Sequence, residues 1–283
     1  CKKGELSYHP LPSLVRRIHI MKDIRAIYEI YSLIKKLHPD IVHVNSTKAG
    51  VLGSIASKLA GAKVVYTVHG FILQEKNGSI RKALYWFLEW IGSLFRDYTI
   101  CVSQSDETLV LKAHCSNVAT TSVIHNSLPR VSFLEKSVAR EKLSLRTTAP
   151  VFGTIANLYE TKGVDILIDA CALLPIDYEC IIIGDGPERE YLLKKVQMLG
   201  LSEKIKFLGA IPSAATLLKA FDLFVLPSRK EGLPFAYLEA KAADIPIVTT
   251  ETGGITEIKG NETTLVPIEN PVALACAIET SLA

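Results

Sequence analysis

The fold of this chain is decided by the stretch PSRKEGLPFAYLEA, which runs from Pro227 to Ala240. The apolar run before it, at 222–226, predicts a buried strand. The residues at 235–243 predict a helix with Pro234 at its first position, where a missing N–H costs nothing. A glycine between the two lets a ligand approach the backbone, and the N–H groups and dipole of a helix start attract phosphate. The stretch therefore indicates an anion site where a strand gives way to a helix.

Two carboxylates lie eight residues apart in this stretch, Glu231 in the turn and Glu239 in the helix. Because carboxylates repel phosphate, we expect both to accept hydrogen bonds from hydroxyl groups, such as those of a sugar and a ribose. The whole stretch is therefore suited to a nucleotide sugar. A solvated loop Glu and a surface helix Glu beside an ordinary strand–helix turn would give the same pattern.

Apolar runs alternate with helical patterns along the rest of the chain. Strands are predicted at 41–44, 64–68, 98–102, 122–124, 151–156, 180–183, 206–211 (a strand with its loop) and 247–249. Helices are predicted at 22–37, after Gly50 to Leu59, at 79–96, 105–114 and 137–143, from Pro187 onward and from 272 onward. This β-α-β order favours parallel sheets covered by helices, with ligands beyond the carboxyl ends of the strands.

The residues EGLPFAYLEA resemble the Glu-x7-Glu motif of the retaining nucleotide-sugar glycosyltransferases of family 4, and further matches follow in order over 41–283. The resemblance implies an α/β fold with two Rossmann-like lobes facing a cleft, the GT-B fold. It implies that Glu231 contacts the donor sugar and Glu239 the nucleotide ribose. It also implies that the loop holds the pyrophosphate, through Gly232, Leu233, Pro234 and Phe235.

The same resemblance places further donor contacts in the second lobe. Lys162 matches a lysine that grips the pyrophosphate, whereas Asn157 stands where the family usually has arginine. Asparagine cannot supply a fork of charged donors, so the phosphate site is weaker here or depends more on Lys162. The turn after 180–183 and the backbone after the next strand are implied to line the nucleotide pocket, at Gly184, Gly186, Ala210 and Ile211. The resemblance implies that backbone groups just after this strand pair with the edge of a uracil. Because the backbone makes this contact, the side chains do not indicate which base is bound.

In the first lobe, His69 follows a predicted strand in Thr-Val-His-Gly, where the resemblance implies a histidine close to the donor sugar and the reacting centre. A lone histidine in this place is otherwise more often a hydrogen-bonded structural residue. Lys48 either contacts an acceptor phosphate or lies on a solvated loop. The two catalytic candidates besides His69 are Glu231 and Lys162.

Two loop positions depart from the family. Ser127 stands where glycine usually follows Asn126, and serine tolerates a left-handed backbone less well, so we expect a different loop shape. Asp244 also replaces a usual glycine, and aspartate tolerates that conformation at some strain. We place the linker at 128–132, between a lobe at 1–129 and a lobe at 130–283.

Charge is divided unevenly between the two lobes. Residues 1–129 carry 16 Lys and Arg against 9 Asp and Glu, and residues 130–283 carry 16 against 20. A basic first lobe suits an anionic acceptor or surface, although unselected surface variation would look the same. The helix at 79–96 is aromatic and begins with Arg81 and Lys82. Most of its apolar face is expected to be core, and peripheral membrane contact is the alternative.

Several classes of protein are disfavoured. No segment is apolar enough to span a membrane, and no signal peptide begins the sequence. The six cysteines are scattered, which suits reduced thiols in a cytoplasmic protein, on the inner face of the membrane if surface contact holds. There is no Asp-x-Asp, no metal-ligand spacing and no G-x-G-x-x-G, so we expect no metal and no cofactor; the nucleotide sugar is a substrate.

The sequence therefore predicts a glycosyltransferase that moves a sugar, most simply from a UDP-sugar, to a glycan or lipid-diphosphate acceptor with retention. We expect no nucleic-acid partner. A nucleotide-sugar epimerase of the same fold and a non-catalytic partner subunit are the alternatives. The chain begins with Cys1, and its first predicted helix precedes its first strand. We therefore expect a fragment whose first lobe is incomplete, shortened at both ends relative to the family.

Overall fold

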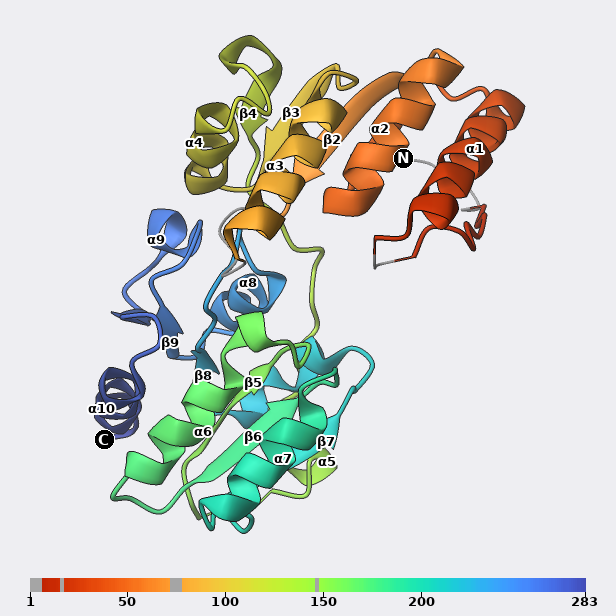
Figure 1. Ribbon diagram of the computed structural model, residues 1–283. Coiled ribbons are helices and arrows are strands. Elements are labelled where there is room, and N and C mark those ends of the chain that lie inside the picture. Colours follow the sequence, from red (N-terminus) through yellow and green to blue (C-terminus); the bar gives the residue numbers. More distant parts are fainter. Residues whose placement is uncertain (1–6, 16–17, 72–77, 146–147) are drawn as a thin grey trace. The chain divides into compact units, whose positions relative to one another are not determined.

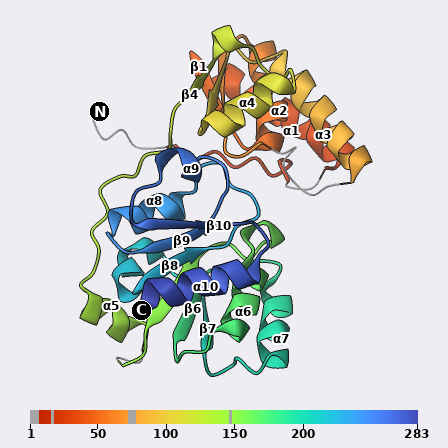
Figure 2. The same cartoon turned by 90° about the vertical axis from the view of Figure 1, so that its left-hand side faces the viewer.

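The computed structural model describes residues 7–15, 18–71, 78–145 and 148–283. The chain divides into two compact units, Cys1–Ile124 and His125–Ala283, each built of parallel strands and helices (Figures 1 and 2). The sequence placed this boundary between residues 129 and 130. The segment between the division and α5 (Lys136–Lys142) is extended.

The first unit is a four-stranded parallel sheet whose spatial order, β1-β2-β3-β4, follows the chain. Its strands are β1 (Ile41–Asn45), β2 (Lys63–Val68), β3 (Tyr98–Cys101) and β4 (Thr121–Val123). Its helices are α1 (Ile20–Leu37), α2 (Thr47–Ala60), α3 (Ser79–Ser93) and α4 (Gln104–Lys112). Right-handed crossovers between successive neighbours place α2, α3 and α4 on one face of the sheet. Val44 and Tyr66 on that face pack with Trp90 of α3 and Leu109 of α4.

Two glycines let α2 lie directly on the strands. A β-carbon at Gly50 would come within 2.4 Å of the Tyr66 ring, and one at Gly53 within 2.7 Å of Val44. Either contact is too short for a real side chain, so any larger residue would push α2 off the sheet. Close packing here fixes the turn that leads from β1 into α2.

The expectation that most of the apolar face of α3 is core is wrong. The fully buried residues of this helix are Glu89 and Gly92, while Leu84, Trp86 and Phe87 are exposed. The inward side instead carries an ion pair, because Arg96 Nη2 donates to Glu89 Oε2 at 2.8 Å and its guanidinium stacks on the Tyr66 ring. A buried charge requires such a partner, and Trp86 and Phe87 of α3 are exposed while Glu89 occupies the inward side.

The second unit is a six-stranded parallel sheet of order β10-β9-β8-β5-β6-β7. Its strands are β5 (Val151–Ile155), β6 (Glu179–Ile183), β7 (Ile205–Gly209), β8 (Leu223–Leu226), β9 (Ile247–Thr250) and β10 (Thr263–Val266). The chain runs outward from β5 in one direction and from β8 in the other. The pair β5–β8 is therefore the topological switch point, where ligands bind in open α/β sheets.

Strands β6 and β8 are buried along their whole length, because helices cover both faces of the sheet. One face packs against α6 (Val164–Leu173), α7 (Arg189–Met198) and α10 (Pro271–Leu282). The other packs against α5, the 3-10 segment Ala214–Ala220, α8 (Phe235–Ala242) and α9 (Ile255–Ile258). Figure 1 shows α6 and α7 lying side by side over β5 and β6.

Some details differ from the sequence expectations. Pro234 is the N-cap residue of α8, directly before the first helical residue, and does not belong to its first turn. Helix α7 begins at Arg189, two residues after Pro187. Asp244 takes the left-handed conformation, with φ 56°, as expected. Ser127 is not among the described residues with positive φ, so the linker there takes a shape that suits serine.

The lower edge of the second unit is tied together by Asp222, which lies just before β8. Its carboxylate accepts from Arg140 Nη2 at 2.6 Å, from Lys136 Nζ at 2.5 Å and from the Val151 amide at 2.7 Å. Burial alone would raise the pKa of Asp222, but these donors and the two positive charges outweigh it and lower the pKa. The charged form of Asp222 is therefore preferred in the folded state.

We expect Asp222→Asn to lower the free energy of unfolding at pH 7 by about 1–3 kcal/mol, since charged hydrogen bonds are lost. A depressed folded pKa gives stability that is present above the unfolded value, about pH 3.9, and is lost as the pH falls through the folded pKa. The gap between parent and variant should therefore shrink below about pH 4. Denaturant unfolding at pH 7 and pH 3 measures it. Asp169→Asn, which breaks a more exposed pair with Lys195, serves as control and should cost less. A gap that is equal at both pH values contradicts the assignment.

Candidate functional site

The site forms where two loops meet at the switch point. One loop, 156–163, joins β5 to α6, and the other, 227–234, joins β8 to α8. The Arg229 amide donates to the Thr161 carbonyl at 2.8 Å, and Arg229 Nη1 donates to the Glu160 carbonyl at 2.6 Å. The two loops are thus joined through their backbones at the carboxyl edge of the sheet.

Gly163 permits this close approach. It has a left-handed φ of 65°, and a β-carbon there would lie 2.0 Å from the carbonyl oxygen of Pro227. A larger residue would be strained by the backbone and would also force the loops apart. The Lys162-Gly163 pair noted in the sequence therefore has two tasks, since the glycine brings the lysine against the opposite loop.

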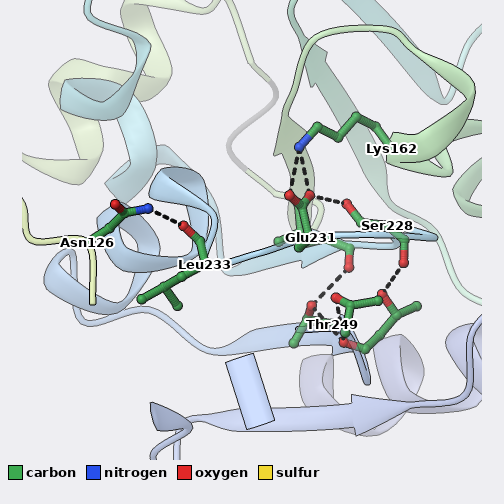
Figure 3. A network of polar contacts seen from close by, with 9 residues as sticks. Asn126, Lys162, Ser228, Glu231, Leu233 and Thr249 are labelled. Atoms are coloured by element: carbon green, nitrogen blue, oxygen red, sulfur yellow. Dashed lines mark hydrogen bonds and ion pairs between the residues drawn. The ribbon is translucent and has the colours of Figure 1, made fainter. Parts of the chain in front are cut away.

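Lys162 and Glu231 form an ion pair across the two loops (Figure 3). Lys162 Nζ donates to Glu231 Oε1 at 2.7 Å and to Oε2 at 2.9 Å, and Ser228 Oγ donates to Oε1 at 2.6 Å. Glu231 is only 8% exposed, so its charge needs these partners. Ser228 is held in turn, because Thr250 Oγ1 donates to its carbonyl at 2.5 Å. The carboxylate is thus fixed in orientation from both sides.

The backbone after Glu231 is held by the turn between β9 and α9. The Gly254 amide donates to the Gly232 carbonyl at 2.5 Å, and a β-carbon on Gly253 would lie 2.2 Å from the Glu231 carbonyl oxygen. Asn126 holds the next residue, since its Nδ2 donates to the Leu233 carbonyl at 2.7 Å. The loop is therefore supported at three successive residues by three different segments.

Helix α8 begins directly after this loop. Pro234 makes no side-chain hydrogen bond to the helix, so it leaves the first N–H groups of α8 without a side-chain cap. Such an end attracts anions. Glu239, in the second turn, is half-buried, and burial raises its pKa. Phe235 is exposed at the helix start.

The loops after β6 and β7 continue the same edge. Gly184 has φ 143°, and a β-carbon there would lie 1.9 Å from the Ala156 carbonyl oxygen. A β-carbon on Gly186 would lie 2.5 Å from the Leu158 carbonyl oxygen. Both glycines are therefore needed for the third loop to lie against the loop after β5. The remaining donor-site candidates lie on this edge, with Asn157 exposed in the loop after β5 and Ala210 and Ile211 directly after β7.

Arg229 stands in the quoted stretch but is not an available cation. Its guanidinium makes two parallel hydrogen bonds to Asp165, at 2.8 and 2.7 Å, and a third to Glu269 at 2.9 Å. Hydrogen bonding to Asp165 raises the pKa of Arg229 further. Of the donor-site candidates named from the sequence, the positively charged one is Lys162.

His69 and Lys48 belong to the first unit. His69 Nε2 lies 3.0 Å from Asn45 Oδ1, and partial burial together with His43 lowers the pKa of His69, so the ring is neutral at pH 7. Lys48 lies in the first turn of α2 and pairs with Asp23 of α1 at 2.5 Å. Its side chain is 19% exposed, so the expectation of a solvated loop lysine is wrong.

Four residues that support the site were not singled out from the sequence. They are Asn126, Asp165, Ser228 and Thr250; three of them contact residues distant in the chain, and Ser228 contacts Glu231 in its own loop. Ser228 had a signal, because it lies in the quoted stretch three residues before Glu231. Asn126 had one as well, because it precedes Ser127 where the family usually has Asn-Gly, whereas Asp165 and Thr250 had none. Within the described ranges, His, Cys, Asp and Glu side chains form no group of three or more that would suit a metal ion.

Comparisons with known proteins agree in both units. A family model described as "Glycosyl transferases group 1" matches residues 135–283, and one described as "Glycosyltransferase Family 4" matches residues 4–129. The UDP-Gal:alpha-D-GlcNAc-diphosphoundecaprenol alpha-1,3-galactosyltransferase of Escherichia coli is 33% identical over 264 residues, which cover 89% of this chain and 68% of that protein. The putative glycosyltransferase EpsD of Bacillus subtilis is 29% identical, over 90% of this chain and 70% of that one.

Solved structures give the same result. Anabaena HepE in complex with UDP-glucose is 28% identical, with a TM-score of 0.79 over 90% of this chain and 71% of that one. The sucrose-phosphate synthase of Thermosynechococcus elongatus, at 22% identity, shares the fold, with a TM-score of 0.82 over 99% of this chain and 72% of that one. The chain belongs to the group 1 glycosyl transferases, is a glycosyltransferase of the family 4 type, and has the GT-B fold of these enzymes.

Proposed function

We propose that this glycosyltransferase moves a hexose or N-acetylhexosamine from a UDP-sugar to a lipid-diphosphate-linked glycan, with retention at the anomeric carbon. The observation that carries the proposal is the Lys162–Glu231 pair at the switch point, beside the open start of α8. The E. coli relative is named for a UDP-galactose donor and a diphosphoundecaprenol acceptor, and the HepE structures hold UDP, glucose or UDP-glucose. Retention rests on the resemblance of the Glu-x7-Glu motif.

In this proposal the pyrophosphate lies at the start of α8. The first N–H groups of the helix, the backbone of Gly232 and Lys162 Nζ would share its charge. As the bond to the sugar breaks, negative charge grows on the leaving diphosphate, and donors already fixed there lower the barrier. Because Asn157 brings no charge, Lys162 carries the cationic part of this task.

Glu231 would then change partners. In the structure both of its oxygens accept from Lys162. A bound diphosphate competes for that lysine, which frees Glu231 Oε2 to accept from a sugar hydroxyl while Ser228 keeps Oε1 in place. Glu239, one helical turn or more away along α8, would accept from the ribose. The donor thus exchanges one set of charged hydrogen bonds for another.

We predict that Lys162→Met weakens UDP binding by about 10- to 100-fold, because a charged contact to phosphate is lost and Glu231 keeps its buried charge without its partner. Isothermal titration calorimetry with UDP measures the change. Lys195→Met removes a lysine of the same unit that pairs with Asp169, away from the loops, and should bind UDP like the parent. Equal affinity in Lys162→Met and the parent would refute the phosphate role.

We expect Glu231→Gln to remain folded and to transfer sugar about 10²- to 10³-fold more slowly, as for the loss of one preorganised catalytic group. Labelled UDP-sugars incubated with extracted bacterial lipid acceptors provide the assay. Glu203→Gln, an exposed change in the same unit, is the control and should match the parent. An epimerised or hydrolysed donor with no labelled acceptor would overturn transfer as the reaction.

The same assay in excess EDTA examines the proposal that transfer needs no metal. Amides, the helix dipole and Lys162 are the groups proposed to neutralise the leaving diphosphate, so the rate should be unchanged. A rate abolished by EDTA and restored by manganese would show that a cation shares this task.

If the acceptor is lipid-linked, the exposed apolar residues of α3 would have a role in contact with the membrane surface. None of the helices among the described residues combines the length and apolar character that a membrane span requires. Three residues on one side of α3 are nonetheless well exposed, Ile80 at 88%, Leu84 at 46% and Phe87 at 47%, with Arg81 and Lys82 beside them. We call these three residues the α3 stripe. An apolar stripe with cations beside it suits the surface of an anionic membrane.

We expect the parent to float with vesicles that contain phosphatidylglycerol, and a variant with serine at the three α3 stripe positions to float much less. Exposed apolar residues of the second unit provide the control, since Tyr191→Ser with Met198→Ser removes a comparable surface elsewhere. Equal flotation of the parent and both variants would remove the membrane role of α3.

A further inference from the structure

The donor loop, defined here as residues 231–234, receives support from the segment that links the two units. The three successive residues at 124–126 hydrogen-bond to three different parts of the chain. The Ile124 amide donates to the Cys101 carbonyl at 2.9 Å, whereas His125 Nε2 lies 3.1 Å from Glu257 Oε2 and Asn126 Nδ2 donates to the Leu233 carbonyl. The hydrogen-bond partners of the chain thus change from the first unit to the second between Ile124 and His125.

The hydrogen bond from Asn126 reaches the buried carbonyl of Leu233, directly before Pro234 and the start of α8. Leu233 is 3% exposed, so its carbonyl oxygen needs a donor. A carbonyl can only accept, which fixes the Asn126 amide with its nitrogen toward Leu233 (Figure 3). Because the peptide is planar, holding this carbonyl also fixes the plane that enters Pro234 and hence the direction in which α8 begins.

The second attachment supports the first. Glu257 lies in α9, directly after the turn whose Gly254 amide holds the Gly232 carbonyl. His125 and Asn126 therefore bind two neighbouring parts of the same support, one on the β9–α9 side and one on the loop itself. Two adjacent linker residues, one bound to α9 and one to the donor loop, hold the loop and its support together.

We propose that Asn126 is a positioning residue for the donor loop. By holding the Leu233 carbonyl it keeps the loop and the start of α8 in the shape that receives a nucleoside diphosphate, so that linker conformation and donor affinity are coupled. This inference rests on the proposed donor site. Coupling of this kind is reciprocal, so the nucleotide that orders the loop must also order the linker.

The test uses the full chain with UDP as the probe. Asn126→Ala and the isosteric Asn126→Asp, which cannot donate from that atom, should each weaken UDP binding by about tenfold in calorimetry with unchanged stoichiometry. Partial misfolding would instead lower the stoichiometry and leave the affinity of the remaining sites unchanged. Ser127→Ala, the neighbouring linker position, is the matched control and should bind like the parent.

Hydrogen exchange tests the positioning role of Asn126 independently of whether the loop binds UDP. Without nucleotide, the peptide covering 231–239 should exchange faster in both Asn126 variants than in the parent and in Ser127→Ala, while β6 is unchanged. UDP should slow exchange across 125–132 in the parent and not in the variants. Faster exchange together with a parent that does not bind UDP would leave the positioning role standing and overturn the proposed donor. Normal loop exchange and normal UDP affinity in both Asn126 variants would overturn the inference.

Discussion

The structure depends on the close approach of two backbone loops at the junction of β5 and β8. Gly163 makes that approach possible, and it brings Lys162 within hydrogen-bonding distance of a carboxylate that is almost wholly buried. Lys162 compensates the buried charge of Glu231, which would otherwise have no oppositely charged partner. In the function proposed above, the same contact that holds the loops together also places a lysine and a carboxylate where a diphosphate sugar would bind.

The positive charges of the site are divided by function. Arg229 has an ideal group for binding phosphate, yet two carboxylates and a carbonyl already occupy it and use it to join the loops. Lys162 has one carboxylate partner, which a ligand can replace. With asparagine at position 157, the proposed donor site would rely on one lysine and the start of α8, where the family resemblance implies two cations.

The sequence predicted the parallel sheets well, because short apolar runs between turn residues are typical of buried strands. It did not predict α6, whose residues Val164, Ile166, Leu167 and Ile168 are all buried, so that no polar face marks the helical period. It was wrong about α3, because the buried partner of that helix is a charged residue. The sequence predicted those candidate site residues that lie together in the stretch from Pro227 to Ala240. Asn126 was noted only as the residue before Ser127, and its contact with Leu233 was missed because that partner lies 107 residues further on, a distance that no local pattern records.

The order of the strands also bears on how each unit folds. In the first unit every neighbouring pair of strands is consecutive in the chain, so each new pairing closes only a short segment. The pair β5–β8 joins Phe152 to Leu223, which requires β6, β7 and their helices to be looped out first. Loop closure of that length slows folding, so we expect the first unit to acquire its sheet earlier, and pulse-labelled hydrogen exchange would show the sequence of events. Lys162 and Glu231 then meet only at this late pairing, so the proposed nucleotide site forms only after β5 and β8 have paired.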